Sequence, residues 1–460
     1  MTQPALLLSS TWSRFPNEHL AVVGAGRRWT WQQTRIIAEE LANGFPALAG
    51  RRVAVPLPAT GVGIGALLGL ERLGCNAFLM DERLTDDEIA KFCESLSLDA
   101  RLVFTPDHVA PSGEISQTSS AGVQRDSSSD ESKPAPLVTI LTSGTSGPPK
   151  AARHTWESLS RPVRLGQPAG QRWWLSYRPH LYAGLQVSLQ CLLNQGTLVA
   201  PTAEMSPNEL VTMMAAEHVE FISATPSYWR RLLLFADRAE LEHVPVKQIT
   251  LGGEIVDQQV LDELTACFPK SVISHIYATT ELGRCFSVRD GRAGFPRDWL
   301  DHPLADGMQL RVQDGELLVR SVNAMVGYDA RGTDARFRYD NAGWFHTGDL
   351  VELTADRVTF AGRQSDLINV GGNKVHPMTV ETVVRAVPGV SDVRVYAQSS
   401  SIAGQLVACE VVLAPGADRS DVLPRIRSAA EAELTTYQRP RILQVVDQLP
   451  LTSAGKVRRG

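Results

Sequence analysis

Short apolar runs alternate along the chain with longer segments in which apolar residues recur at helical spacing. The runs "RLVFTP", "GTLVAP" and "FISATP" predict buried strands, and "NELVTMMAAEH" and "YWRRLLLFA", which follow the last two, predict helices. Alternation of strands and helices is typical of α/β units on a largely parallel sheet. We therefore predict an α/β fold, with a large N-terminal region of several subdomains whose sheets are rich in parallel strands.

Val53 to Leu70 is an uncharged stretch of 18 residues, a length that admits a membrane span. Its two prolines and four glycines oppose one lipid-exposed helix, and "RRVAVPLP" followed by "ALLGLERLG" instead predicts a buried strand, a turn and a helix. The first residues, "MTQPALLLSSTWSRF", lack the basic region of a secretory signal. We expect no membrane span and a cytoplasmic location.

The pattern changes after about residue 362, where "VRVYA", "LVACEVVLAP" and "ILQVVD" predict strands of a compact α+β unit. Its length of about 100 residues is the commonest domain size. We predict an N-terminal domain over residues 1–362 and a small mobile α+β domain over residues 363–460. The first is expected to contain subdomains, because single cores rarely grow beyond ~250–300 residues.

Charge and cysteine content narrow the possible partners. A formal net charge of -5 without a block of basic residues argues against nucleic acid. Six cysteines without C-x-x-C pairs are expected to be buried, reduced thiols. The partners are therefore expected to be small molecules, and nothing in the sequence indicates an oligomeric state.

The stretch "TSGTSGPPK" follows the apolar run "PLVTIL", so a polar loop is expected at the end of a buried strand, where open α/β sheets bind ligands. Glycines permit close backbone approach, hydroxyl and N–H groups donate to phosphate oxygens, and the lysine adds a positive charge. Two prolines separate Gly147 from Lys150, unlike the usual P-loop, and "GTSG" is one residue short of the G-x-S-x-G elbow of hydrolases. Alone, such a loop is more often a flexible turn. The candidate phosphate-binding residues are Thr142, Ser143, Gly144, Thr145, Ser146, Gly147 and Lys150.

A serine-rich segment precedes this loop. Ser112 to Ala135 is expected to be a flexible surface excursion.

Four further motifs follow this loop in order: "IYATTELG", "GWFHTGDL", "GRQSDLINVGGNKV" and "LPLTSAGKVRR". Together with the loop, they resemble the adenylate-forming superfamily, in particular its acyl- and aryl-CoA synthetases. The resemblance covers nearly the whole chain. It implies that a carboxylic acid reacts with ATP to give acyl-AMP and pyrophosphate, after which a thiol displaces AMP. ATP, Mg²⁺ and coenzyme A are the implied cofactors and co-substrate.

The resemblance also implies roles for individual residues. The glycine-rich loop would hold the β- and γ-phosphates, Thr280 would contact the α-phosphate, and Glu281 would bind Mg²⁺, a hard cation that prefers oxygen. Tyr277 would stack on adenine, and Asp349 would accept both ribose hydroxyls. The remaining residues implied at the nucleotide are Gly252, Gly253, Glu254, Ala278, Thr279 and Arg363.

Lys456, in "TSAGK", resembles the family lysine that enters the site with the second domain and bridges the acid carboxylate and the α-phosphate. Without the motif, a lysine so near the end of the chain would be a solvated charge. Ser365 stands at the hinge position, where the family usually has Asp or Lys. A hinge needs only to absorb a backbone change, so the domain rotation between the two half-reactions is compatible with serine.

The acid pocket is expected around "WWLSYRPHLYAGLQ", which contains no acidic residue. A buried ammonium group would have no partner there, which argues against a free α-amino acid as substrate. "PHLYAG" resembles a segment of aryl- and acyl-CoA ligases, and the aromatic residues slightly favour an aryl acid. His180 is equally compatible with a structural histidine, and the methyl of Ala278, where glycine is common, would narrow the pocket. The candidate pocket residues are Tyr177, His180, Tyr182 and Gly184.

Two further questions stay open at this point. The segment "VGGNKVHPMTVE" resembles CoA ligases more than peptide-synthetase domains, which favours coenzyme A as the thiol. The phosphopantetheine of a separate carrier protein is the alternative. A catalytically inactive nucleotide-binding protein is disfavoured by the joint presence of Glu281, Asp349 and Lys456. A serine hydrolase is disfavoured because the nucleophile elbow is absent.

Overall fold

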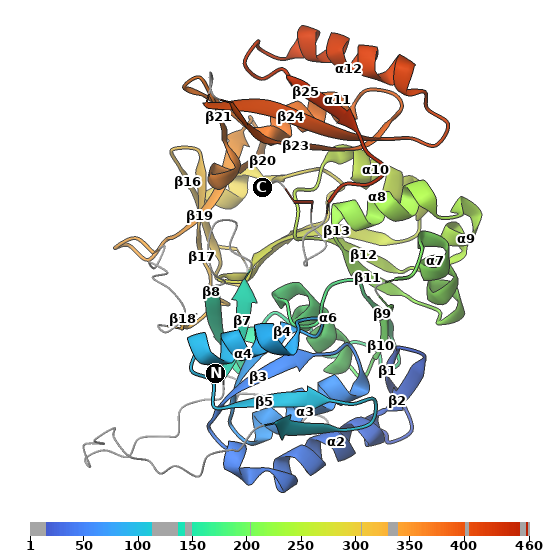
Figure 1. Ribbon diagram of the computed structural model, residues 1–460, viewed down its shortest axis with the longest axis vertical. Coiled ribbons are helices and arrows are strands. Elements are labelled where there is room, and N and C mark those ends of the chain that lie inside the picture. The colour runs from blue at the N-terminus through green and yellow to red at the C-terminus, as the bar shows by residue number, and fades with distance from the viewer. Residues whose placement is uncertain are drawn as a thin grey trace.

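Four β-sheets and their covering helices make up the fold, as seen in a computed structural model (Figure 1). It describes residues 15–112, 137–142, 150–202, 204–304, 306–329, 339–400, 404–450 and 457–458, and every structural statement concerns these ranges. The strands of the first hundred residues lie at one end of the molecule and the last sheet lies at the other.

Sheet A has eight strands, and its six inner strands run parallel to one another. Its order is β14 (Gly283–Val288), β13 (Val272–Thr279), β12 (Gln248–Leu251), β11 (Phe221–Ala224), β9 (Arg172–Leu175), β10 (Thr197–Ala200), β1 (Leu20–Gly24) and β2 (Arg27–Thr30). The edge strands β2 and β14 are antiparallel hairpin partners of their neighbours. Sheet A therefore ends in the hairpin β13–β14, which carries "IYATTELG".

Sheet B has seven strands with a parallel centre formed by β5, β3, β4 and β7. Its order is β18 (Gly327–Tyr328), β8 (Lys150–Thr155), β7 (Leu137–Thr142), β4 (Asn76–Asp81), β3 (Arg52–Leu57), β5 (Ala100–Phe104) and β6 (Val109–Ser112). The glycine-rich segment lies between β7 and β8, at the end of a buried strand as predicted from "PLVTIL".

The helices bury their apolar faces against these sheets. An apolar cluster joins both large sheets through α2 (Trp31–Gly44), α3 (Gly61–Arg72) and α6 (Tyr182–Leu192). A second cluster packs α7 (Pro207–Ala216), α8 (Pro226–Phe235), α9 (Arg238–His243) and α10 (Gln258–Cys267) on sheet A. The remaining N-terminal helices are α4 (Asp86–Ser95), α5 (Trp156–Ser160), η1 (Pro46–Leu48) and η2 (Arg297–Leu300).

Close packing explains the glycines of the uncharged stretch. A Cβ atom at Gly65 would lie 2.8 Å from Ile37 on α2, so α3 approaches α2 only because this side chain is absent. The stretch itself forms β3 followed by α3, which confirms the predicted strand, turn and helix. No helix within the described ranges has the length and apolar character needed to cross a membrane.

Sheets C and D follow along the chain. Sheet C contains β15 (Phe295–Pro296), β20 (Arg357–Arg363), β19 (Phe345–Leu353), β17 (Glu316–Arg320) and β16 (Gln309–Gln313). Sheet D contains β22 (Asn373–Val375), β21 (Ile368–Val370), β24 (Gly404–Leu413), β23 (Val390–Ser400) and β25 (Ile442–Val445), covered by α11 (Pro377–Arg385) and α12 (Arg419–Glu433). The short helix η3 (Gln364–Asp366) connects the two sheets. The division at residue 362 remains a prediction, and we use it below as a working boundary.

All six cysteines are free, and only Cys93 is not fully buried. Burial raises the pKa of all six thiols; that of Cys75, for example, rises to about 12. The serine-rich segment predicted to be flexible falls, apart from Ser112, outside the described ranges.

Candidate functional site

The hairpin β13–β14 presents the central motif at its turn. Thr280, Glu281 and Leu282 form the connection, and the hydroxyl of Thr279 accepts a hydrogen bond from the N–H of Leu282 at 3.1 Å. Gly283 has a φ of +69°, and a Cβ atom there would lie 2.7 Å from the carbonyl of Asn323. The glycine therefore allows the tight turn that holds Thr280 and Glu281 together at the end of sheet A.

Glu281 is held by a tyrosine that the sequence motifs did not indicate. The hydroxyl of Tyr328, on β18, donates to Oε1 of Glu281 at 2.8 Å, and the N–H of Met325 donates to the carbonyl of Glu281 at 2.8 Å. Lys150 lies with its Nζ 5.7 Å from the centre of the Tyr328 ring. The end of the predicted phosphate loop and the predicted metal-binding acid thus share one aromatic neighbour.

Asp349 is the centre of the predicted ribose site, and it is 6% exposed. Tyr277 donates its hydroxyl to Oδ2 of Asp349 at 2.5 Å, and Nε of Arg363 donates to Oδ1 at 2.9 Å. Asp349 and Arg363 are direct partners in the β19–β20 ladder, which explains the ion pair. The negative charge of Asp349 raises the pKa of Arg363. Two residues that the sequence placed at the ribose therefore meet.

The ring of Tyr277 lies in an aromatic cluster. Its centroid is 5.3 Å from that of Phe286 and 5.1 Å from that of Phe360, with an angle of 22° between the planes in both cases. Burial and the neighbouring Asp349 raise the pKa of the Tyr277 hydroxyl well above its usual value. The predicted adenine-stacking role of Tyr277 remains a prediction.

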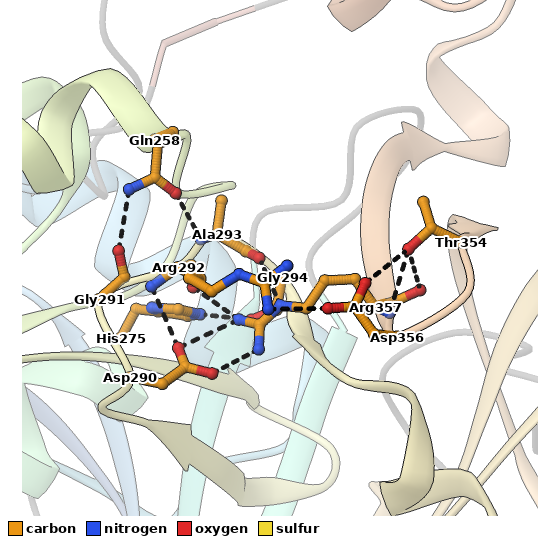
Figure 2. Close-up of polar contacts among 10 residues, drawn as sticks. All are labelled: Gln258, His275, Asp290, Gly291, Arg292, Ala293, Gly294, Thr354, Asp356 and Arg357. Carbon is orange, nitrogen blue, oxygen red and sulfur yellow. Dashed lines mark hydrogen bonds and ion pairs between the residues drawn. The ribbon is translucent and has the colours of Figure 1, made fainter.

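Arg357 fixes the position of β20 relative to the loop that follows β14 (Figure 2). It forms a two-contact ion pair with Asp290 and donates to the carbonyls of Arg292, Ala293 and Gly294 at distances of 2.7 to 3.1 Å. His275, on β13, makes a 2.8 Å contact from Nε2 to the carbonyl of Gly294. This network connects the hairpin that carries Tyr277 with the hairpin that carries Asp349.

The "GGE" segment follows β12 and contacts two other parts of the site. The hydroxyl of Tyr177 donates to the carbonyl of Gly252 at 3.1 Å, and Gly253 has a φ of +82°, which favours glycine. Glu254 accepts hydrogen bonds from the N–H of Ser227 and from that of Val457, both at 3.0 Å. Val457 directly follows Lys456 in the sequence, so the C-terminal motif reaches this segment of the N-terminal domain.

The candidate acid pocket lies around the start of α6. His180 is 6% exposed, and burial lowers its pKa to about 4, so the ring is neutral near pH 7. Tyr182 accepts a hydrogen bond from the N–H of Arg284 at 3.0 Å. A Cβ atom at Gly184 would lie 2.0 Å from the carbonyl of Arg178, so this glycine lets α6 pack closely on the preceding turn.

His154 is a buried polar residue that the sequence analysis missed. It lies on β8 with an exposed fraction of 0%, and its Nε2 is 2.7 Å from the carbonyl of Thr280. Because a carbonyl only accepts, Nε2 carries the proton, and Nδ1 faces the hydroxyl of Ser158 at 3.2 Å. Burial lowers the pKa of His154 to about 4. As a neutral hydrogen-bond donor, His154 therefore positions the turn between β13 and β14 through the carbonyl of Thr280.

Several predicted residues lie outside the described ranges. They are Ser143, Gly144, Thr145, Ser146 and Gly147 of the phosphate loop, and Lys456. The predicted hinge residue Ser365 is described; it is exposed in η3 and donates its hydroxyl to Asp366 at 2.9 Å. Its role as a hinge remains a prediction.

The carboxylates of Asp349 and Glu281 lie beside the hairpin β13–β14 of a large α/β region with parallel-rich sheets, and a small C-terminal unit follows. These features are those of a nucleotide-binding enzyme of two domains. Residues 8–329 match the family model of the AMP-binding enzymes, and residues 379–456 match the model of the AMP-binding enzyme C-terminal domain. The chain belongs to the AMP-binding enzyme family. This finding confirms the resemblance to adenylate-forming acyl- and aryl-CoA synthetases and the expected α/β fold.

Curated relatives include 2-succinylbenzoate–CoA ligases. That of Listeria monocytogenes serotype 4b is 24% identical over 475 residues, which cover 97% of this chain and 96% of the relative. That of Staphylococcus aureus (strain JH9) is 24% identical over 493 residues, covering 96% of both chains.

Solved structures share the fold over nearly the full length. ATP-bound MatB from Rhodopseudomonas palustris has a TM-score of 0.78 at 20% identity, with 99% of this chain and 97% of that chain covered. The anthranilate CoA ligase AuaEII in complex with anthranoyl-AMP has a TM-score of 0.78 at 17% identity, with 98% and 95% covered. MenE from Bacillus subtilis in complex with AMP has a TM-score of 0.72 at 21% identity, with 99% and 97% covered.

Proposed function

We propose that this enzyme uses ATP to convert a carboxylic acid, an aryl or other non-amino acid, into acyl-AMP and pyrophosphate, and then transfers the acyl group to coenzyme A. The observation that carries the proposal is the placement of Asp349 and Glu281. Asp349 is held beside Tyr277 by Arg363. Glu281 lies at the turn of the hairpin β13–β14, which also carries Tyr277, and it is held by Tyr328. This arrangement supports a nucleotide with its ribose at Asp349 and its phosphates at Thr280 and Glu281.

Each side chain has a defined task in this reaction. Asp349 accepts hydrogen bonds from the ribose hydroxyls, replacing the contacts that it now makes with Tyr277 and Arg363. Thr280 donates to the α-phosphate, where negative charge accumulates as the carboxylate attacks. The neutral ring of His180 lines the acid pocket without adding a charge that would compete for the reacting carboxylate.

Glu281 is suited to hold Mg²⁺ together with the phosphates of ATP. Its Oε1 accepts from Tyr328, while no contact is found for Oε2 among the described residues. Mg²⁺ usually takes one or two carboxylates and completes its shell with water and substrate phosphates, so a single glutamate fits. When bound, the ion would neutralise part of the charge on the triphosphate.

Lys456 is the proposed catalytic lysine of the C-terminal domain. The contact between Val457 and Glu254 supports this role, because consecutive Cα atoms are only about 3.8 Å apart. A cation that acts mainly on the developing charge of the transition state contributes about 10² to 10³ in rate. Lys456→Ala is therefore expected to bind ATP and acid while losing most of the acid-dependent pyrophosphate exchange.

The pocket supports an acid without an ammonium group. Asp81 is the acidic residue whose charge acts on His180, and it already receives two hydrogen bonds from Arg83, at 3.0 and 2.6 Å from Nε and Nη2. The carboxylate of Asp81 is thus already occupied and does not offer a free partner to an α-amino group. An aryl acid such as the 2-succinylbenzoate named in the curated relatives is compatible with the aromatic wall.

A screen for pyrophosphate release over aryl, short-chain and medium-chain acids, with free amino acids as controls, tests the proposal. We expect ATP-dependent release with at least one aryl acid and none with amino acids. Binding of ATP without release for any acid would instead indicate a catalytically inactive nucleotide-binding protein.

The acceptor thiol is tested separately. Preformed acyl-AMP is mixed in turn with coenzyme A and with a phosphopantetheine-loaded carrier protein, and thioester is measured by mass spectrometry. We expect product with coenzyme A. Product with the carrier protein alone would assign the enzyme to carrier-protein loading.

A further inference from the structure

Arg284 lies beside residues of the candidate acid pocket. In the β13–β14 ladder it is the direct partner of Ala278, so the two side chains leave the hairpin on the same face. Ala278 packs against the apolar cluster that contains Tyr177 and Tyr182. The backbone of Arg284 is fixed from both sides, since its N–H donates to Tyr182 at 3.0 Å and its carbonyl accepts from Asn323 at 2.9 Å.

Among the residues that the structure describes, none is a partner of the Arg284 guanidinium. Within the described residues it makes neither an ion pair nor a side-chain hydrogen bond, although the residue is only partly exposed. Arg357 shows the contrast, because that buried guanidinium contacts Asp290 and three carbonyls (Figure 2). A sequestered cation without a counter-charge is unfavourable, so a structural role for Arg284 would normally come with a partner.

Two more arginines add to the positive charge. Burial lowers the pKa of Arg284, and the charges of Arg164 and Arg289 lower it further, while Asp306 acts in the opposite direction. Arg289 also has a lowered pKa, from burial and from Arg164. Asp306 is exposed and forms no ion pair with any of the three within the described part of the chain. Among the charged side chains that act on the pKa of Arg284, two are arginines and one is an aspartate.

We propose that the acid substrate carries a second anionic group, such as a carboxylate, and that Arg284 binds this group while the first carboxylate reacts with ATP. This inference rests on the proposed function and specifies its substrate class. The fork of the guanidinium matches a carboxylate in bidentate geometry, and the anion would neutralise the partly buried charge. Arg164 and Arg289 favour the dianionic acid through their field, without a contact being required.

Matched pairs of acids that differ by one carboxylate test this proposal. The pairs are 2-succinylbenzoate with 3-benzoylpropionate, phthalate with benzoate, and glutarate with valerate. We compare kcat/KM for acid-dependent pyrophosphate release by the wild type, Arg284→Met and Arg284→Lys. Arg427→Met is the control. Arg427 lies on α12, is exposed, and forms no ion pair with any described residue.

We expect the wild type to favour the diacid of at least one pair. Arg284→Met should lower kcat/KM for that diacid by about 10- to 100-fold, the usual effect of losing a hydrogen-bonded charge partner, with little change for the monoacid. Arg284→Lys should retain part of the preference, because it keeps the charge but not the fork. Arg427→Met should behave as the wild type does.

Two outcomes would overturn the inference while leaving the proposed function intact. One is a wild type that uses the monoacid of every productive pair at least as well as the diacid. The other is an Arg284→Met variant that remains folded, as judged by its thermal unfolding, and loses activity equally toward both acids. Absence of pyrophosphate release with every acid would refute the proposed function itself, so the two failures are distinguishable.

Discussion

Asp349 shows how a single residue can be prepared for a ligand by its own protein. Both of its oxygens accept hydrogen bonds, from Tyr277 and from Arg363, so the carboxylate is oriented before any nucleotide arrives. A ribose presenting two hydroxyls would replace donors that are already in place. The energetic cost of burying the carboxylate is thus met by the fold rather than by the ligand.

Asp349→Asn tests this residue. An amide accepts at only one of its two positions and turns an N–H group toward either Tyr277 or Arg363, so one donor loses its acceptor. We expect the KM for ATP to rise by about 10- to 100-fold in pyrophosphate exchange. Glu352→Gln, an exposed change on the same strand, is the control. An unchanged KM in Asp349→Asn would contradict the ribose assignment.

Buried histidines predict a dependence of stability on pH. Burial lowers the pKa of both His154 and His180 to about 4, whereas the unfolded chain binds these protons near pH 6.5. Between these values the unfolded state holds more protons, so the free energy of unfolding falls as the pH drops from 6.5 to 4. We expect a loss of roughly 2–3 kcal/mol per histidine across this range.

Urea unfolding at pH 7.5 and at pH 4.5 measures this effect. The wild type is compared with His154→Gln, which retains a donor toward the carbonyl of Thr280 but does not titrate. We expect a shallower dependence on pH in the variant. The exposed change His218→Gln serves as the control and should keep the slope of the wild type.

At the scale of elements, the site depends on two hairpins that come from different sheets. The hairpin β13–β14 belongs to sheet A and β19–β20 belongs to sheet C, and they are joined by the contact between Tyr277 and Asp349. Arg357 provides a second connection away from the site (Figure 2). Loss of this second connection should therefore disturb both stability and nucleotide binding.

Arg357→Met tests the coupling between these hairpins. The side chain is 6% exposed, and its removal leaves Asp290 without its ion-pair partner and the carbonyls of Arg292 and Ala293 without the donors that Arg357 supplies. Removing one member of a buried pair typically costs about 3–5 kcal/mol, and we expect about 2–3 kcal/mol because Asp290 is 39% exposed. Arg292→Met, which breaks an exposed pair with Asp356, should change stability by less than about 1 kcal/mol. Equal losses in the two variants would contradict the structural role of Arg357.

The elements that the sequence predicted are those with a clear period. Strand β3 with helix α3, β10 with α7, and β11 with α8 all follow from apolar runs and helical spacing. Strands β15 and β18 have only two residues each, so their pattern is too brief to separate from that of loops. Their partners, β20 and β8, are also distant along the chain, and no local signal specifies such pairing.

The site residues also fall into those that the sequence indicated and those that it did not. Thr280, Glu281 and Asp349 lie in motifs that the resemblance identified. His154 and Tyr328 act on this motif from 126 and 47 residues away, through single side chains without a characteristic spacing. Only the packing of β8 and β18 in sheet B brings them to the turn.

At the scale of the whole molecule, ion pairs connect the two domains of the working division. Asp257, the N-cap of α10, pairs with Arg230 of α8 and lies 3.6 Å from Arg385 of α11. Arg385 in turn lies 3.6 Å from Asp392, on β23. Burial raises the pKa of Asp392, while the charges of Arg230 and Arg385 oppose this shift. These charges hold α11 near the nucleotide-binding domain, in the arrangement where Val457 contacts Glu254.

If the second domain rotates between the two half-reactions, the pair between Asp257 and Arg385 forms in only one of them. Asp257→Asn keeps the capping oxygen that accepts from Val260 at 3.0 Å but removes the charge that faces Arg385. With a loss of about 1 kcal/mol, the adenylation rate should fall about fivefold, while thioester formation from supplied acyl-AMP stays unchanged or rises. Asp237→Asn is the matched control, since Asp237 caps α9 in the same manner and makes no ion pair within the described residues. Pyrophosphate exchange and thioester formation are measured separately, and an equal fall in both would show that the pair supports the fold rather than one orientation of the domains.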